Sequence, residues 1–273
     1  MNRLTAVLMP TLLLPCTLAW AELPAGIKAR GEIVAAIMPN YPPLEFKDPV
    51  TNSLTGFDHD LGNALAERLG VKIRWQETAF EQMLSALVTQ RVDIVLSGMT
   101  DTAERQKSVI FVDYFTSGPQ FYTLRQNTEI NHSSELCGKS VGASRRTTFV
   151  AEIAQWSKAQ CEALGKPAVK VMGTEGSADA RAQLRQGRVD AAVQGSETLP
   201  YLNQQEQNTY KTLGEPFAVQ LTGLGISKNN PALANAIKAA LQAMVADGSY
   251  QALLEKWDLG PGAVATVTLN NGK

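Results

Sequence analysis

Short apolar runs alternate with amphipathic segments along the first part of the chain. Residues 31–37 and 71–75 have the length and composition of strands, and the mostly apolar run 92–96 is typical of a buried parallel strand. Between them, residues 57–69 and 80–90 carry apolar side chains three and four positions apart, which predicts helices. A strand-helix-strand-helix-strand order predicts a parallel sheet with helices on its faces.

The same alternation begins again further along the chain. Strands are predicted at residues 138–143, 169–172 and 189–193, and helices at residues 148–164 and 177–186. This second series predicts a smaller lobe of the same kind. The predicted fold class is therefore α/β with two lobes, each a sheet flanked by helices.

Two segments are predicted to connect the lobes. Residues 120–124 lead into the second lobe and residues 217–221 lead out of it, so both ends of the chain build the first lobe. After the return, residues 231–247 predict a helix with proline at its first position, and residues 250–257 predict a last amphipathic piece. The expected boundaries are 22–123 with 218–273 for lobe 1, and 124–217 for lobe 2.

Residues 1–21 are expected to be a signal peptide and not part of the fold. Arg3 supplies a positive start, residues 4–18 are apolar, and residues 19–21 form an A-x-A cleavage motif. The first mature residue would be Glu22, which predicts export to the periplasm. The apolar stretch is short for a bilayer span and contains two prolines, so a retained membrane anchor is not expected.

The length and charge of the chain limit the classes of molecule that it is expected to bind. The mature chain of about 250 residues is long enough for two cores. Without Arg3 it has 24 lysines and arginines against 26 aspartates and glutamates, a net charge of −2. This balance, with no basic stripe, argues against a nucleic-acid partner.

The cysteines predict a disulfide. Cys16 lies in the leader behind a proline, which fits a lipoprotein site poorly, so a lipid anchor is not expected. Cys137 and Cys161 remain, and an even count in an exported chain favours a bridge, the alternative being two buried thiols. Neither histidine lies at ligand spacing from them, so no metal site is expected.

The loop after the apolar run 92–96 has chemistry suited to a carboxylate. Residues 97–105 read S-G-M-T-D-T-A-E-R, and Thr102 is predicted to begin a helix. Hydroxyls, loop N–H groups, a helix start and the bidentate fork of Arg105 together favour an anion. Ligands bind at the carboxyl ends of strands in open α/β sheets, where this loop is expected to lie. The alternative is an ordinary turn with a solvated arginine.

A series of motifs runs in a fixed order through nearly the whole mature chain. They are P-P-L-E-F at 42–46, T-G-F-D-H-D-L at 55–61, L-V-T-Q-R-V-D at 87–93, the loop 97–105, F-V-D-Y-F at 111–115, L-C-G-K-S-V-G at 136–142, Q-G-R-V-D-A-A at 186–192, G-S-Y at 248–250 and K-W at 256–257. The series resembles the family 3 extracellular solute-binding proteins. These are periplasmic receptors of polar-amino-acid ABC importers, with a two-lobe, type II fold.

The resemblance implies ligand contacts at the loop and across the cleft. Arg105 would clamp the ligand α-carboxylate, Thr100 would serve it with N–H and hydroxyl, and Thr147 would donate to it from lobe 2. The carbonyl of Gly98 would take the α-ammonium, with Ser97 beside it.

Six further residues have less specific assignments. By the same resemblance Tyr41 and Phe80 would sandwich the ligand side chain, the alternative being ordinary core packing. Four aspartates are expected to be structural. They are Asp58 and Asp60, as cap and first-turn charges of the helix 57–69, and Asp93 and Asp190, beside buried strands.

One departure from the family concerns the ligand amino group. Gly195 stands where the family usually has an aspartate that pairs with the α-ammonium. Loss of that carboxylate removes a bond worth about 1.5–3 kcal/mol. Either Glu197 or Ser196 replaces it, or the ligand lacks a free primary α-ammonium.

Two other departures lie near the predicted cleft. Arg146 stands where a glycine usually precedes the binding threonine, and with Arg145 it would add positive charge at the mouth unless both point to solvent. Met38 occupies a position that is acidic in receptors for basic amino acids. We therefore expect a neutral or acidic amino acid, or a derivative such as an opine or a cyclic amino acid.

The expected function is a monomeric receptor that closes two lobes on one such carboxylate and presents it to a permease in the inner membrane. No cofactor and no catalytic residue are expected. One alternative is a cyclohexadienyl-type dehydratase of the same fold, with Glu175 or Glu197 as general acid. Another is a receptor that signals and does not transport.

Overall fold

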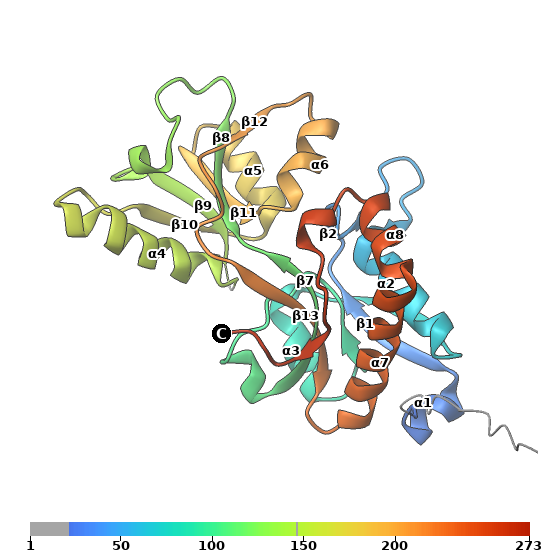
Figure 1. Ribbon diagram of the computed structural model, residues 1–273. Coiled ribbons are helices and arrows are strands. Elements are labelled where there is room, and N and C mark those ends of the chain that lie inside the picture. Colours follow the sequence, from blue (N-terminus) through green and yellow to red (C-terminus); the bar gives the residue numbers. More distant parts are fainter. Residues whose placement is uncertain (1–21, 146) are drawn as a thin grey trace, which may run out of the picture.

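The computed structural model describes residues 22–145 and 147–273, so the predicted leader with Cys16, and Arg146, lie outside the described residues. Figure 1 shows two lobes, one above the other. The longer helices are α1 Ala25–Arg30, α2 Phe57–Arg68, α3 Phe80–Val88, α4 Phe149–Gln160, α5 Ser177–Arg185, α6 Thr198–Gln205, α7 Pro231–Asp247 and α8 Ser249–Lys256, and the 3₁₀ turns are η1 Arg105–Lys107, η2 Ser133–Leu136, η3 Glu162–Leu164 and η4 Gly260–Gly262. The strands are β1 Glu32–Ile37, β2 Asn40–Tyr41, β3 Glu45–Lys47, β4 Leu54–Thr55, β5 Lys72–Glu77, β6 Ile94–Val95, β7 Val109–Ser117, β8 Pro119–Leu124, β9 Ser140–Ser144, β10 Lys170–Thr174, β11 Ala191–Gly195, β12 Tyr210–Thr212, β13 Gln220–Ser227 and β14 Thr268–Leu269.

Lobe 1 is built on a six-stranded sheet in the order β14-β7-β13-β6-β1-β5. Strands β1, β5 and β6 run parallel, as predicted, while β13 pairs antiparallel with both β6 and β7. A large core joins one face of the sheet to α2, α7 and α8, and a smaller one joins the other face to α3. Strand β6 covers only Ile94–Val95 and is shorter than the predicted run 92–96, whose other residues belong to the flanking loops.

Lobe 2 is built on a five-stranded sheet in the order β10-β9-β11-β8-β12. The predicted strands and helices of this lobe are all present, although the helix expected over 148–164 ends at Gln160 and gives way to a 3₁₀ turn. The two-lobe α/β fold class is thereby confirmed. Among the described residues no helix is both long and apolar enough to cross a bilayer.

The lobes are joined where β7 continues into β8 and where the chain returns into β13. Strand β8 pairs with β11 and β12, so it belongs to lobe 2 and the first crossing lies at residues 117–119, before the expected boundary at 123. A Cβ on Gly118 would collide with the backbone oxygen of Ala218. The two crossing segments therefore run in close contact, and glycine is required at that point.

Three of the four aspartates assigned to structure hold elements together. Asp93 accepts hydrogen bonds from Arg30 and from the N–H of Val34, and Asp190 accepts from the N–H of Ser140, as expected for structural residues. Asp60 is not simply a first-turn charge. It accepts from Lys256 Nζ at 2.7 Å and from Trp257 Nε1 at 2.8 Å, and so links α2 to the end of α8.

The predicted disulfide between Cys137 and Cys161 is present and ties η2 to the end of α4. Replacing both cysteines by serine is expected to lower the free energy of unfolding by about 3 kcal/mol, because the bridge closes a loop spanning 24 positions. Urea unfolding of the oxidised protein and the variant measures the difference. The dithiothreitol-reduced wild type is the control and should unfold with the variant; equal midpoints for all three would contradict the prediction.

Candidate ligand-binding cleft

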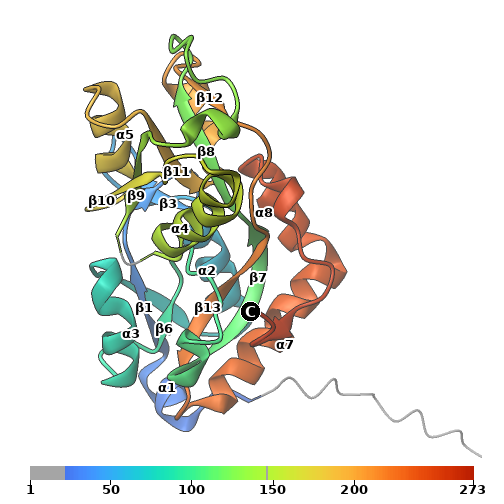
Figure 2. The same ribbon diagram turned by 90° about the vertical axis from the view of Figure 1, so that its left-hand side faces the viewer.

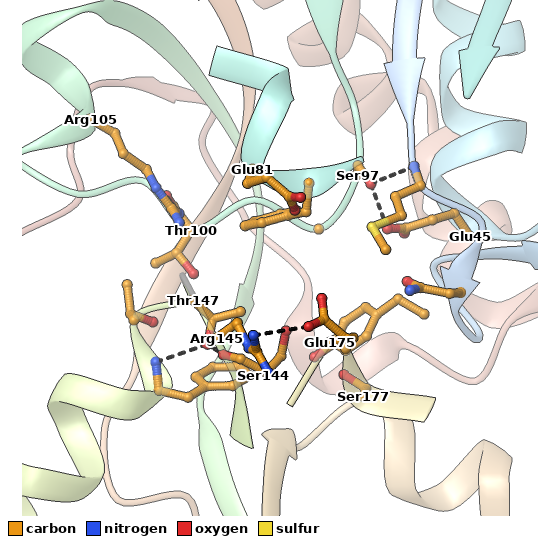
Figure 3. Close-up of a pocket in the computed structure, with 18 residues that line it drawn as sticks. Glu45, Glu81, Ser97, Thr100, Arg105, Ser144, Arg145, Thr147, Glu175 and Ser177 are labelled. Atoms are coloured by element: carbon orange, nitrogen blue, oxygen red, sulfur yellow. Dashed lines mark hydrogen bonds and ion pairs between the residues drawn. The ribbon is translucent and has the colours of Figure 1, made fainter. Parts of the chain in front are cut away.

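A cavity lies between the two lobes, with lining residues from both of them. Together with the part open to solvent it holds about 910 Å³ of empty space. Figure 3 shows Arg105 and Thr100 on one side and Glu45 with Ser97 on the other. Its lining residues are Met38, Asn40, Tyr41, Glu45, Phe80, Glu81, Ser97, Gly98, Thr100, Arg105, Ser144, Arg145, Thr147, Thr148, Phe149, Glu175, Gly176 and Ser177.

Arg105 forms the cationic end of the cavity. Its Nη1 donates to the carbonyl of Thr100 at 2.7 Å, and the guanidinium carbon lies 5.6 Å from the centre of the Phe80 ring. Burial lowers the pKa of Arg105, whereas the negative charges of Asp101 and Glu152 oppose that change. A guanidinium has a pKa far above neutrality, so the group remains a cation that can take a carboxylate.

The α-helix predicted to begin at Thr102 is absent. The chain forms only the single 3₁₀ turn η1, and the Thr102 hydroxyl accepts from the N–H of Arg105 at 3.2 Å. Thr102 therefore acts as a turn residue that orients Arg105, and the loop offers no helix N-terminus to an anion.

The helix N-terminus at the cavity comes instead from lobe 2. The start of α4 places Thr147, Thr148 and Phe149 on the wall. The Thr147 hydroxyl donates to the carbonyl of Ser144 at 2.7 Å and accepts from the N–H of Phe149 at 3.3 Å, so it is engaged within the turn. The positive end of this 12-residue helix adds to the charge of Arg105 and favours an anion there.

The opposite end of the cavity carries a buried acid that sequence analysis missed. Glu45 is 2% exposed, and its Oε1 accepts from Ser97 Oγ at 2.8 Å, which itself accepts from the N–H of Met38 at 3.1 Å. The other oxygen, Oε2, has no hydrogen-bond partner among the described residues. Burial and the nearby Asp58 raise the pKa of Glu45 well above its usual range. The sequence placed Glu45 in a family motif but gave no sign that its side chain faces the cavity.

Asp58 is not the helix cap that the sequence predicted. Its side chain is fully buried and accepts from Tyr114 Oη and from the N–H of Gly98, both at 2.8 Å. Gly98 has a φ of 53°, the left-handed region that favours glycine. Burial raises the pKa of Asp58 to about 7. Asp58 has two fixed donors and Glu45 has one, so the rise in pKa is stronger at Glu45.

Gly195 and Glu197 lie behind the cavity wall. The N–H of Gly195 donates to Tyr41 Oη at 2.9 Å across the lobes, and Glu197 accepts a hydrogen bond from Ser117 Oγ. A Cβ on Gly195 would collide with both carboxylate oxygens of Glu197 and with Tyr41 Oη. Glu197 and Tyr41 therefore fill the space into which a side chain at 195 would project, and burial raises the pKa of Glu197.

An ion pair marks the rim of the cavity. Arg145 Nη1 lies 2.9 Å from Glu175 Oε1, and Arg145 Nη2 donates to the carbonyl of Gly173 at 3.2 Å. Both charged side chains are more than half exposed. The positive charge expected at the mouth is thus balanced by a carboxylate from the same lobe.

The residues predicted to bind the ligand fall into two groups, those that line the cavity and those that do not. On the cavity wall it places Tyr41, Phe80, Ser97, Gly98, Thr100, Arg105 and Thr147, and it leaves Gly195 and Glu197 off the wall. Ser97 is 2% exposed and its hydroxyl is occupied by Met38 and Glu45, so it supports Glu45 more than it offers a contact of its own.

Two lobes that enclose a polar cleft with one cationic end define a solute-binding protein. The chain belongs to the bacterial extracellular solute-binding proteins of family 3, whose profile matches residues 33–261. It is 30% identical to an L-arginine-binding protein of Pseudomonas aeruginosa, over 93% of this chain and 94% of that one. It is also 30% identical to the L-cystine-binding protein of Escherichia coli, over 85% of this chain and 84% of that one.

A solved structure supports the fold assignment. An ancestral amino-acid-binding protein, described as a precursor of cyclohexadienyl dehydratase, superposes with a TM-score of 0.74 at 33% identity, covering 85% of this chain and 97% of that one. The chain therefore has the type II, two-lobe fold that the resemblance implied.

Proposed function

We propose that this protein is a periplasmic receptor of an ABC importer that closes on one amino acid or amino-acid derivative. The observation that carries the proposal is the partly buried guanidinium of Arg105, which lines the same cleft as the N-terminus of α4. Relatives named for arginine and cystine binding support the ligand class. Closure would bend the crossing segments at residues 117–119 and 218–220, where the glycine at 118 permits a close approach.

The far end of the ligand faces Glu45 in this proposal. Burial raises the pKa of Glu45, which favours its neutral form beside an uncharged polar ligand end, and a ligand cation on this wall would favour its ionised form instead. The sequence argued against basic ligands because Met38 replaces an acid found in receptors for basic amino acids. In the structure, however, Glu45 supplies an acid on the same cavity wall as Met38. We therefore include arginine-like and glutamine-like ends among the ligands to be tested.

The amino end of the ligand is expected to be substituted. Tyr41 closes the space in front of Gly195, so Glu197 stands behind it and no carboxylate reaches the cleft from that position. A free primary ammonium would lose a charge-assisted bond there, whereas an acylated or alkylated nitrogen demands less. This supports a ligand that keeps the α-carboxylate and lacks a free primary α-ammonium.

Calorimetric titration with paired ligands tests this proposal. L-arginine and L-glutamine would each be compared with their Nα-acetyl and N-(1-carboxyethyl) derivatives. We expect at least one derivative to bind about tenfold more tightly than its parent, which corresponds to one lost charge-assisted bond. Tighter binding of both parent amino acids would contradict the assignment of the amino end, and binding of none of these compounds would contradict the ligand class.

The geometry gives less support to a dehydratase. Glu175 lines the cavity but is exposed and paired with Arg145, and Glu197 does not line it, so neither acid proposed for that role is both buried and on the wall. Glu45 is the acid on the cavity wall whose pKa is raised by burial. Incubation with prephenate, followed by absorbance for phenylpyruvate, tests the alternative; we expect no product, and turnover abolished in Glu45→Gln would establish the enzyme.

A further inference from the structure

A short segment after α8 is docked against the back of the ligand loop. We call residues 267–272 the strap. Strand β14 of the strap pairs with β7, and Asn270 exchanges two hydrogen bonds with the backbone of Phe111, at 3.1 and 2.7 Å. The end of the chain lies against lobe 1 in both views (Figures 1 and 2). The strap therefore covers the sheet beside the loop that carries Arg105.

The strap ends on a buried carboxylate of the ligand loop. The N–H of Gly272 donates to Asp101 Oδ2 at 2.8 Å, while Gln106 Nε2 donates to Asp101 Oδ1 at 2.8 Å and to the carbonyl of Gly272 at 3.0 Å. Asp101 is 2% exposed, so these donors replace water around its charge. A Cβ on Gly272 would collide with the backbone oxygen of Asp101, so glycine is required for this approach.

The guanidinium of Arg105 donates to the carbonyl of Thr100, the residue next to Asp101, yet no hydrogen bond joins the Asp101 and Arg105 side chains. Both carboxylate oxygens of Asp101 are held by the strap and by Gln106 instead. A buried carboxylate that lost the Gly272 donor would be drawn toward a neighbouring cation, because an unpaired buried charge is costly. The guanidinium of Arg105, which already binds the carbonyl of the adjacent Thr100, is such a cation, and it must stay free for a ligand carboxylate.

We propose that the strap positions Asp101 so that it does not pair with Arg105, which keeps the guanidinium open to the cleft. The proposal rests on the proposed function only in taking Arg105 as the carboxylate clamp. Asp101 and Gly272 are positioning residues, since neither lines the cavity. Docking of the strap would thus set the strength of the clamp from outside the cleft.

Labelling of Arg105 by phenylglyoxal tests the proposal without any ligand. The variant Asn270→Ala/Gly272→Ala removes one hydrogen bond and introduces the collision with Asp101, and hydrogen exchange of the strap amides reports its release. We expect Arg105 to label about fivefold more slowly in this variant, with exposed Arg91 as the internal reference. Adding Asp101→Asn should restore the rate, because an amide cannot neutralise the guanidinium.

If the strap only stabilised the loop, the labelling rates of Arg105 would differ from those expected above. Loosening of the loop alone would speed labelling, and Asp101→Asn would then add to the damage. Gly260→Ala is the matched control, because open space surrounds that glycine in the same part of the chain. An unchanged or faster rate in the released variant, no rescue by Asp101→Asn, or strap amides that remain protected would each overturn the proposal. The outcome is independent of whether the compounds titrated above bind.

Discussion

Replacing Arg105 by methionine is expected to weaken ligand binding by about a hundredfold, which corresponds to loss of a partly buried, bidentate partner for a carboxylate. Methionine has a similar length and keeps the contact with Phe80, but it offers no donor. The N-terminus of α4 would then hold the ligand carboxylate alone. Calorimetry with the tightest compound of the proposed series measures the loss.

Two comparisons make this result specific to the clamp. Arg105→Lys keeps the charge without the planar fork and should lose about tenfold, between wild type and Arg105→Met. The amide of the same ligand, which lacks the carboxylate, should bind Arg105→Met and wild type almost equally. A rim control, Arg145→Met, should change affinity little, because Arg145 is already paired with Glu175. Unchanged affinity in Arg105→Met would remove Arg105 from the site.

The periodic part of the sequence predicted the fold well. Apolar spacing located the helices α2, α3, α5 and α7 and the parallel strands, because burial of one face imposes the same period on sequence and structure. The antiparallel insertion of β13 between β6 and β7 was not visible, since strand order depends on contacts between distant segments. The same limit applies to β8, whose pairing with β11 and β12 is not visible in the sequence.

The site was predicted only where one segment carries its chemistry. The loop 97–105 holds Gly98, Thr100 and Arg105 within a few positions, and all three reach the cavity. Asp58 looked like a first-turn charge because its partners, Tyr114 and Gly98, are remote in sequence. The local pattern of apolar and polar residues predicts which side chains are buried. It does not predict which buried side chains from distant segments contact each other.

Gly195→Asp is expected to lower affinity for every ligand by about tenfold or more. The new side chain collides with Glu197 and with Tyr41 Oη, and it sets a second carboxylate beside a buried one. The collision with Tyr41 of lobe 1 opposes closure, and the collision with Glu197 lies within lobe 2 and opposes folding of that lobe. We therefore expect both the affinity and the melting temperature to fall.

The double variant Gly195→Asp/Glu197→Ala distinguishes the steric effect of the new side chain on affinity from the effect of its charge on ligand preference. It removes the competing carboxylate of Glu197, so the new acid can reach the cleft wherever the Tyr41 hydroxyl moves aside, and binding of unsubstituted amino acids should recover in part. The ratio of affinities for L-arginine and Nα-acetyl-L-arginine is expected to shift by about tenfold toward the free amino acid. Glu197→Ala alone is the control and should leave the ratio unchanged, since no new acid faces the cleft. A ratio that stays the same in the double variant would show that position 195 does not select the amino end, and the preference would then have to come from Tyr41 and Gly98.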